Sequence, residues 1–181
     1  MISRFGRTGL IAALACALAL GAAACGEEEH SEVVEGEPIE LGDLHFNVAL
    51  TRFLNPNDLE DREYIEGLPQ PPTGEAYLGV FKSVDNEGDD PVSLPEETDM
   101  KVIDTTGEEF EPAESETVFA FPFGDTVEPG GEVPAEDTAS ASGPIQGSVV
   151  LVLMDIAAAE NRPLELELVA DGEEGIVELD I

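Results

Sequence analysis

The sequence predicts an all-β fold, an antiparallel β-sandwich of about seven to nine short strands, with one short helix in a long loop. Apolar and polar residues alternate with a period of two through most of the chain after residue 38, as in strands that bury one face. Turns rich in glycine, proline and aspartate separate these stretches, and no stretch has a long helical period. A closed β-barrel is the alternative arrangement of the same strands.

The first two long strands are expected at residues 44–51 and 76–84, where apolar residues occupy every second position. Lys82 falls on the same face of the second strand as Leu78 and Val80. The later strands are expected at residues 100–104, 108–111, 118–123, 145–154, 164–168 and 176–179. The stretch 145–154 is the most apolar of them, which places it at the centre of a sheet.

Three phenylalanines, Phe119, Phe121 and Phe123, alternate along the expected strand 118–123. Large aromatic residues at every second position are typical of the inner face of a sandwich. Pro122 lies among them, and proline is confined to edge strands. An exposed aromatic edge that docks a partner is therefore the second interpretation.

Residues 55–74 form a long loop between the first two strands, where a hairpin needs only two to five residues. Asn57 and Glu60 have the spacing of a capping box, which predicts a short helix over residues 58–65. The loop also carries residue types that anchor protein interfaces. The candidate partner-binding residues are Arg62, Tyr64, Ile65 and Leu68. A lid over one end of the sandwich is the other interpretation of this loop.

Residues 1–24 have the three parts of an export signal, with two arginines, an apolar run and a small-residue end. Ordinary cleavage after Ala24 would release a soluble protein. The run Ala23-Ala24-Cys25 instead resembles the bacterial lipobox, whose cysteine is acylated and becomes the N-terminus. Acylation explains why an exported chain keeps Cys25 as its single cysteine. We therefore expect an extracytoplasmic protein, held on the outer face of the cell membrane by lipid on Cys25.

After the signal, residues 25–37 are an acidic tether with few apolar residues, which predicts disorder, and residues 38–181 form one domain. Past position 24 the chain has 41 acidic and five basic residues, a net charge of −36. Nucleic acid is excluded as a partner, because binding phosphates requires a basic surface.

The densest acidic run offers only weak cation candidates, Asp85, Glu87, Asp89 and Asp90. The run lacks the ligand spacing and the distal glutamate of an EF-hand, so it is interpreted as a hairpin turn. Weak binding of divalent cations is a hypothesis, and no dedicated metal site is predicted.

An enzyme is not expected, and no cofactor is predicted. The chain after the signal has two histidines, His30 in the tether and His45 on a strand, and it lacks a Gly-x-Ser-x-Gly turn. The two histidines are too far apart for the spacing of a transition-metal site. The chain contains no tryptophan on which a sugar could stack, which disfavours glycoside cleavage.

Four short motifs resemble a widespread family of uncharacterised bacterial lipoprotein domains. They lie at residues 77–92, 104–110, 128–131 and 147–151, and the second has the form Asp-x-x-Gly-x-x-Phe. The resemblance covers residues 44–181 and implies a telokin-like, immunoglobulin-like sandwich with no catalytic residues. Residues 55–74 and 132–143 are similar to additions in actinobacterial members.

These observations predict a non-enzymatic surface lipoprotein whose immunoglobulin-like domain binds an envelope protein or an extracellular ligand. The alternative is a carrier or sensor of cations or small molecules at the cell envelope. The two differ in the 55–74 loop, because a docking module needs Tyr64 and Leu68 exposed, whereas a carrier needs a concave pocket.

Overall fold

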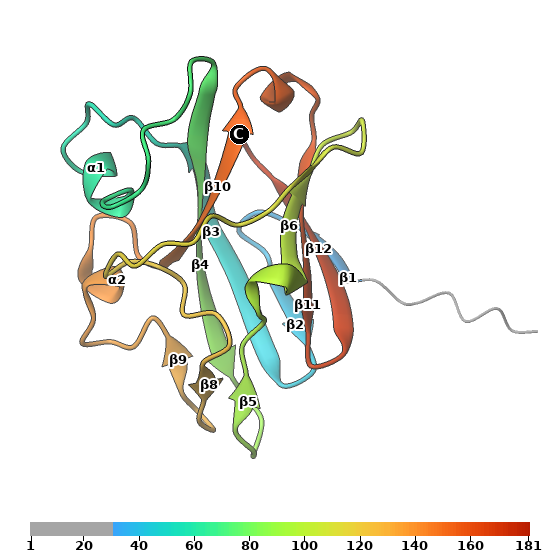
Figure 1. The fold of residues 1–181 in the computed structure, drawn as a ribbon. Coiled ribbons are helices and arrows are strands. Elements are labelled where there is room, and N and C mark those ends of the chain that lie inside the picture. The colour runs from blue at the N-terminus through green and yellow to red at the C-terminus, as the bar shows by residue number, and fades with distance from the viewer. Residues whose placement is uncertain (1–30) are drawn as a thin grey trace, which may run out of the picture.

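The computed structural model describes residues 31–181, and it is a β-sandwich, as the sequence predicts (Figure 1). One sheet has the strand order β1-β12-β11-β6-β7 and the other β10-β4-β3-β2, with β9 paired to β4 and a separate small pair, β5-β8. The strands are β1 (Ser31–Val34), β2 (Pro38–Leu41), β3 (Leu44–Phe53), β4 (Glu75–Asn86), β5 (Val92–Ser93), β6 (Met100–Ile103), β7 (Glu109–Phe110), β8 (Thr126–Val127), β9 (Glu132–Val133), β10 (Ser148–Asp155), β11 (Leu164–Ala170) and β12 (Glu173–Leu179). The short helices are α1 (Asp61–Tyr64), η1 (Glu97–Asp99), α2 (Ala139–Ser142) and η2 (Ala158–Glu160).

The described chain has twelve strands instead of seven to nine, because four of them are only two residues long. Pairs this short leave no alternating pattern in the sequence. All pairings are antiparallel except that of β1 with β12, which is parallel.

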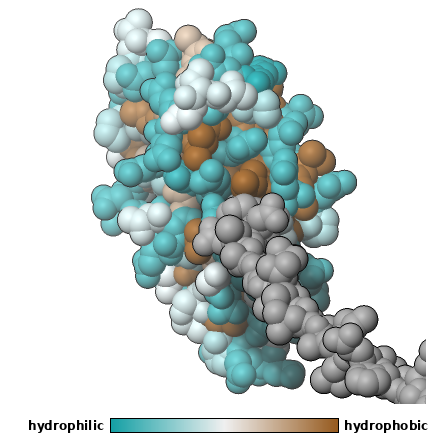
Figure 2. All heavy atoms as spheres, turned by 90° about the vertical axis from the view of Figure 1, so that its right-hand side faces the viewer, coloured by the Kyte–Doolittle hydropathy of each residue, from teal (hydrophilic) through white to brown (hydrophobic). Residues whose placement is uncertain are grey.

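The inner core lies between the two sheets and follows the alternation in the sequence. Leu164, Leu166 and Leu168 of β11 are buried there, whereas Glu165 and Glu167 are half-exposed on the other face. Seen from the side of this sheet, the surface is mainly hydrophilic, with apolar atoms in small separate groups (Figure 2). This alternation confirms the strand prediction.

β4 is buried on both faces, which places it at the centre of its sheet, between β3 and β10. Leu78 and Val80 face the inner core, whereas Tyr77 and Phe81 face a second apolar cluster on the outer side of the sheet, here called the outer cluster. β10 lies beside β4, and its outer edge is covered by residues 111–125. The sequence correctly separates the two faces of β4 but does not show what covers the outer one.

Residues 111–125 replace the strand expected at 118–123, and we call them the strap. Within the strap only Pro112 and Ala120 form single β-bridges to β10, because prolines 112 and 122 have no N–H to extend a ladder. Phe121 is nevertheless buried in the inner core and packs edge to face against Phe123. The expected strand is wrong, and the expected core position of Phe121 is right.

Residues 31–34 of the tether expected at 25–37 are not disordered, because Ser31–Val34 form β1 against the free edge of β12. Val33 packs against the inner core, and its neighbours Glu32 and Val34 are exposed. The carboxylate of Glu35 accepts hydrogen bonds from the backbone N–H of Thr51 (3.1 Å) and of Asp180 (3.2 Å). An acidic segment can therefore form an edge strand while burying little apolar surface.

The predicted signal at 1–24 and Cys25 lie outside the described residues. Among residues 31–181, no helix is long and apolar enough to cross a membrane.

Asp104 holds the hairpin between β6 and β7 together. Its Oδ1 accepts hydrogen bonds from the Thr106 hydroxyl (2.7 Å), the Thr106 N–H (2.8 Å) and the Glu108 N–H (3.0 Å). Its Oδ2 accepts one from the Asn161 amide (2.7 Å), 57 residues away. These bonds to the charged form, led by that of Thr106, lower the pKa of Asp104 to about 2.

We expect the stabilisation by Asp104 to be present above pH 4 and to be lost as the pH falls through about 2, because the pKa is lower in the folded state. Urea unfolding of wild type and Asp104→Asn at pH 6, 4 and 2 tests this. The variant should be less stable at pH 6, and the difference should shrink towards pH 2. A difference that stays constant over this range would show that the charge of Asp104 is not the cause.

Candidate functional site

The 55–74 loop folds back over the outer face of β4. Tyr64 is 1% exposed, and its ring packs edge to face against those of Phe81 (centroids 4.9 Å apart) and Phe119 (4.8 Å). Ile65 is also buried in this outer cluster. The prediction that Tyr64 contacts a partner is therefore corrected, because its side chain fastens the loop to the sheet.

The short helix in the loop exists, but its cap differs from the prediction. α1 covers only Asp61–Tyr64, and Asn57 does not cap it. The Oδ1 of Asp58 instead accepts hydrogen bonds from the N–H groups of Glu60 (2.9 Å) and Asp61 (3.3 Å). Asp58 is one residue further along the chain, and its carboxylate is an equally good acceptor at a helix start.

Asp61 and Tyr77 tie the two ends of the loop down. The buried carboxylate of Asp61 accepts a hydrogen bond from the Asn55 N–H (2.8 Å) and forms an ion pair with Arg52 of β3. The hydroxyl of Tyr77 donates to the Pro69 carbonyl (3.1 Å), and burial raises its pKa. The loop is thus fixed to β3 and β4 by charged, polar and aromatic contacts together.

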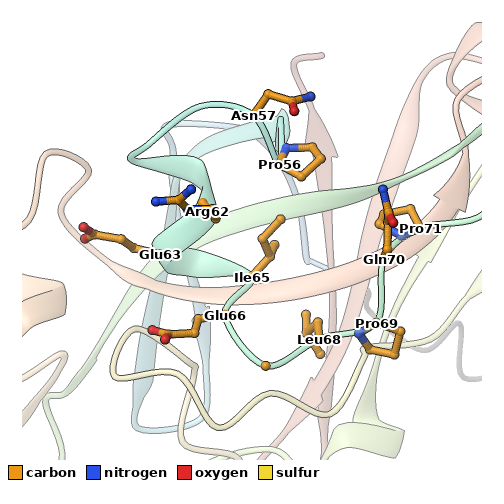
Figure 3. Close-up of a pocket in the computed structure, with 11 residues that line it drawn as sticks. Pro56, Asn57, Arg62, Glu63, Ile65, Glu66, Leu68, Pro69, Gln70 and Pro71 are labelled. Atoms are coloured by element: carbon orange, nitrogen blue, oxygen red, sulfur yellow. The ribbon is translucent and has the colours of Figure 1, made fainter.

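The loop encloses a pocket of about 630 Å³, here called the loop pocket, whose lining residues all fall between positions 56 and 71. In Figure 3 the side chain of Ile65 points into the space between Pro56 and Pro71, with Leu68 beside Pro69. The lining is apolar there and polar around it, from Asn57, Arg62, Glu63, Glu66 and Gln70.

The structure brings three of the four candidate residues into this pocket. Arg62 is exposed on its rim, Leu68 is half-buried in its wall, and the buried Ile65 contributes to its floor. Tyr64 does not line the pocket and packs into the outer cluster. The prolines that shape the wall are visible in the sequence, but their closure around Ile65 is not.

The cation candidates Asp85, Glu87, Asp89 and Asp90 do not converge. Within residues 31–181, no group of three or more histidine, cysteine, aspartate or glutamate side chains is arranged to hold a metal ion. The turn is instead held by the buried side chain of Asn86. Its amide donates to the carbonyls of Asp90 (2.9 Å) and Val127 (2.8 Å), and its Oδ1 accepts from the Gly88 N–H (2.9 Å).

No family model and no curated protein matches the sequence. Solved structures do share the fold. An uncharacterized β-sandwich protein from Clostridium difficile 630 is 14% identical, with a TM-score of 0.51, over 85% of this chain and 97% of that one. The secreted protein MPT63 from Mycobacterium tuberculosis is 12% identical, with a TM-score of 0.49, over 82% and 97% of the two chains. A candidate lipoprotein, ycdA from Bacillus subtilis, is 11% identical, with a TM-score of 0.49, over 81% of this chain and 38% of that one.

At these identities the likeness establishes the β-sandwich alone. The first of these proteins is itself described as uncharacterized. The chain is therefore a β-sandwich protein similar to bacterial proteins of unknown function.

Proposed function

We propose that this protein is a non-enzymatic binding module, displayed at the cell surface by lipid on Cys25, which holds an envelope protein through the loop pocket. The observation that carries the proposal is the pocket itself, a hollow built by one inserted segment on a fixed sheet. Binding residues are commonly carried by loops that a rigid scaffold positions.

The pocket has the composition of a protein-binding site. Leu68 and the prolines provide an apolar wall that can receive an apolar side chain, and the polar rim can hydrogen-bond around it. The loop is already ordered by Tyr64, Asp61 and Tyr77, so little conformational entropy is lost on binding.

The charge of the chain selects the kind of partner. With 41 acidic residues against five basic ones past position 24, the surface attracts a protein with basic residues around its apolar anchor. Glu63 and Glu66 on the rim favour the same partner, whereas exposed Arg62 can pair with a single carboxylate of that partner. Because the attraction is electrostatic, high salt should slow the association.

Crosslinking in intact cells tests the proposal. The comparison is between wild type, Arg62→Glu/Leu68→Ser, and Arg162→Glu as a matched control, because Arg162 is an exposed arginine that does not line the pocket. We expect the same partner with wild type and with the control, and at least tenfold less of it with the double variant at equal surface abundance.

Capture of the same partner by the double variant would overturn the proposal, as would the absence of any partner from the wild type. The volume of the pocket lies within the range of about 300–1,000 Å³ that is typical of small-molecule sites. A small-molecule carrier would then be the next hypothesis to test.

A further inference from the structure

Lys82 of β4 is completely buried between the two sheets. Its neighbours across the sheet are Val48 of β3 and Ser148 of β10. The Nζ lies 2.8 Å from the Sδ of Met100 and 3.6 Å from the ring centroid of Phe121. A lysine in an apolar interior normally has a carboxylate partner, and among residues 31–181 Lys82 forms no ion pair.

The charged groups on the elements packed around Lys82 face elsewhere. His45 of β3 lies near Glu87, and Lys101 of β6 is paired with Glu109 and Glu167. The acidic residues of the strap and of β10 are exposed; they are Glu111, Glu114, Glu116, Asp125 and Asp155. The amine therefore contacts aromatic rings and one thioether, and the buried Ser148 lies beside Lys82 on β10.

Burial is the dominant effect on this amine. It lowers the pKa of Lys82 well below the ordinary value of 10.5. A contact between a cation and a phenylalanine ring stabilises the ammonium by less than its removal from water costs. The folded interior thus favours the uncharged amine, and a proton on Lys82 favours any state in which water reaches it.

The strap is the wall of this site that lies outside the strand ladders. Phe46 and Met100 belong to strands inside the sheets, but Phe121 is held by the irregular strap. Near Phe121 the strap is fastened to β10 by two backbone hydrogen bonds, from Phe121 N–H to the Val149 carbonyl (2.9 Å) and from Val149 N–H to the Phe119 carbonyl (2.8 Å). Releasing them would uncover the Nζ without breaking the ladders of β4.

We propose that Lys82 and the strap form a proton-operated latch, in which protonation of the amine releases Phe121 and lifts the strap from β10. In the closed state Phe121 covers the amine, and in the open state the strap is lifted from β10. The closed state binds fewer protons than the open state, so opening becomes easier as the pH falls. One proton is involved, and the population of the open state therefore rises at most about tenfold for each unit of pH.

Hydrogen–deuterium exchange of the purified protein at pH 6, 7.5 and 9, corrected for the intrinsic exchange rate, tests the latch. The reporting amides are those of Phe121 and Val149, and the reference amides are those of β11. In wild type we expect the protection of the reporting amides to fall by at least tenfold between pH 9 and pH 6, relative to the reference amides. In Lys82→Met, and in Lys82→Leu as a second variant, this pH dependence should disappear.

Two results would overturn the latch. One is an equal pH dependence in wild type and in both variants. The other is a loss of protection that is the same in the strap and in β11, because that pattern reports unfolding of the whole domain.

Discussion

Tyr64→Ala should lower the free energy of unfolding by about 3–5 kcal/mol, the usual cost of removing a buried aromatic ring. The ring fills the space between Phe81 and Phe119, and it joins the loop, β4 and the strap in one cluster. The surrounding strands cannot collapse into the cavity, because β4 is fixed between β3 and β10. Urea unfolding, followed by circular dichroism, measures the loss.

Tyr64→Phe is the control for this experiment. The buried hydroxyl of Tyr64 makes no hydrogen bond of good geometry among residues 31–181, although the backbone of Ile145 lies near it, so its removal should change the stability by less than about 1 kcal/mol. If Tyr64→Ala also cost less than that, the loop would not depend on this ring. Because Tyr64→Ala lowers the stability of the domain, this variant cannot be used to test docking. A substitution of the exposed Arg62 can be used for that test.

Gly147→Ala should destabilise the protein by about 2–5 kcal/mol, from backbone strain and overpacking together. The residue has φ +137°, a conformation that side chains with a Cβ rarely adopt. An added Cβ would lie 3.0 Å from the backbone N and 3.1 Å from the backbone O of Lys82. Backbone atoms in the middle of β4 cannot move aside without disturbing both neighbouring strands.

Gly107→Ala separates the two causes. This glycine also has positive φ (+83°), but nothing lies within 4 Å of an added Cβ. We expect a cost of about 1–2 kcal/mol from the left-handed backbone alone. Equal losses of stability in the two variants, measured by urea unfolding, would show that the contact with Lys82 adds nothing at Gly147.

The parts of the fold that could be predicted are those in which local pattern and tertiary environment agree. In β11 the alternation of Leu166 with Glu165 and Glu167 follows directly from one buried and one exposed face. The turn at Asp104 was likewise visible, because its glycine and short polar residues are turn formers.

The parts that could not be predicted depend on contacts between distant segments. Tyr64 is a residue type that is common at interfaces, and only the folding of the loop onto Phe81 turns it into a core residue. The alternation in the sequence places Lys82 on the same face of the strand as Val80. Nothing in the sequence indicates that its amine will be buried beside Met100. β1 has no strand pattern in the sequence, because Val33, its one contact with the core, lies within an acidic segment.

In the proposed lipid-anchored protein, the early start of β1 limits how far from the membrane the domain can lie. Six residue steps separate Cys25 from Ser31, a distance of at most ~20 Å. Ser31 lies opposite Gly175, near the end of the sandwich where Gly42 approaches Asp171, whereas the 55–74 loop leaves the other end, after Phe53. The twelve residues of β4 run between these ends and span ~40 Å. A lipid on Cys25 would therefore keep the loop pocket within ~60 Å of the bilayer and limit its partners to proteins that enter this layer.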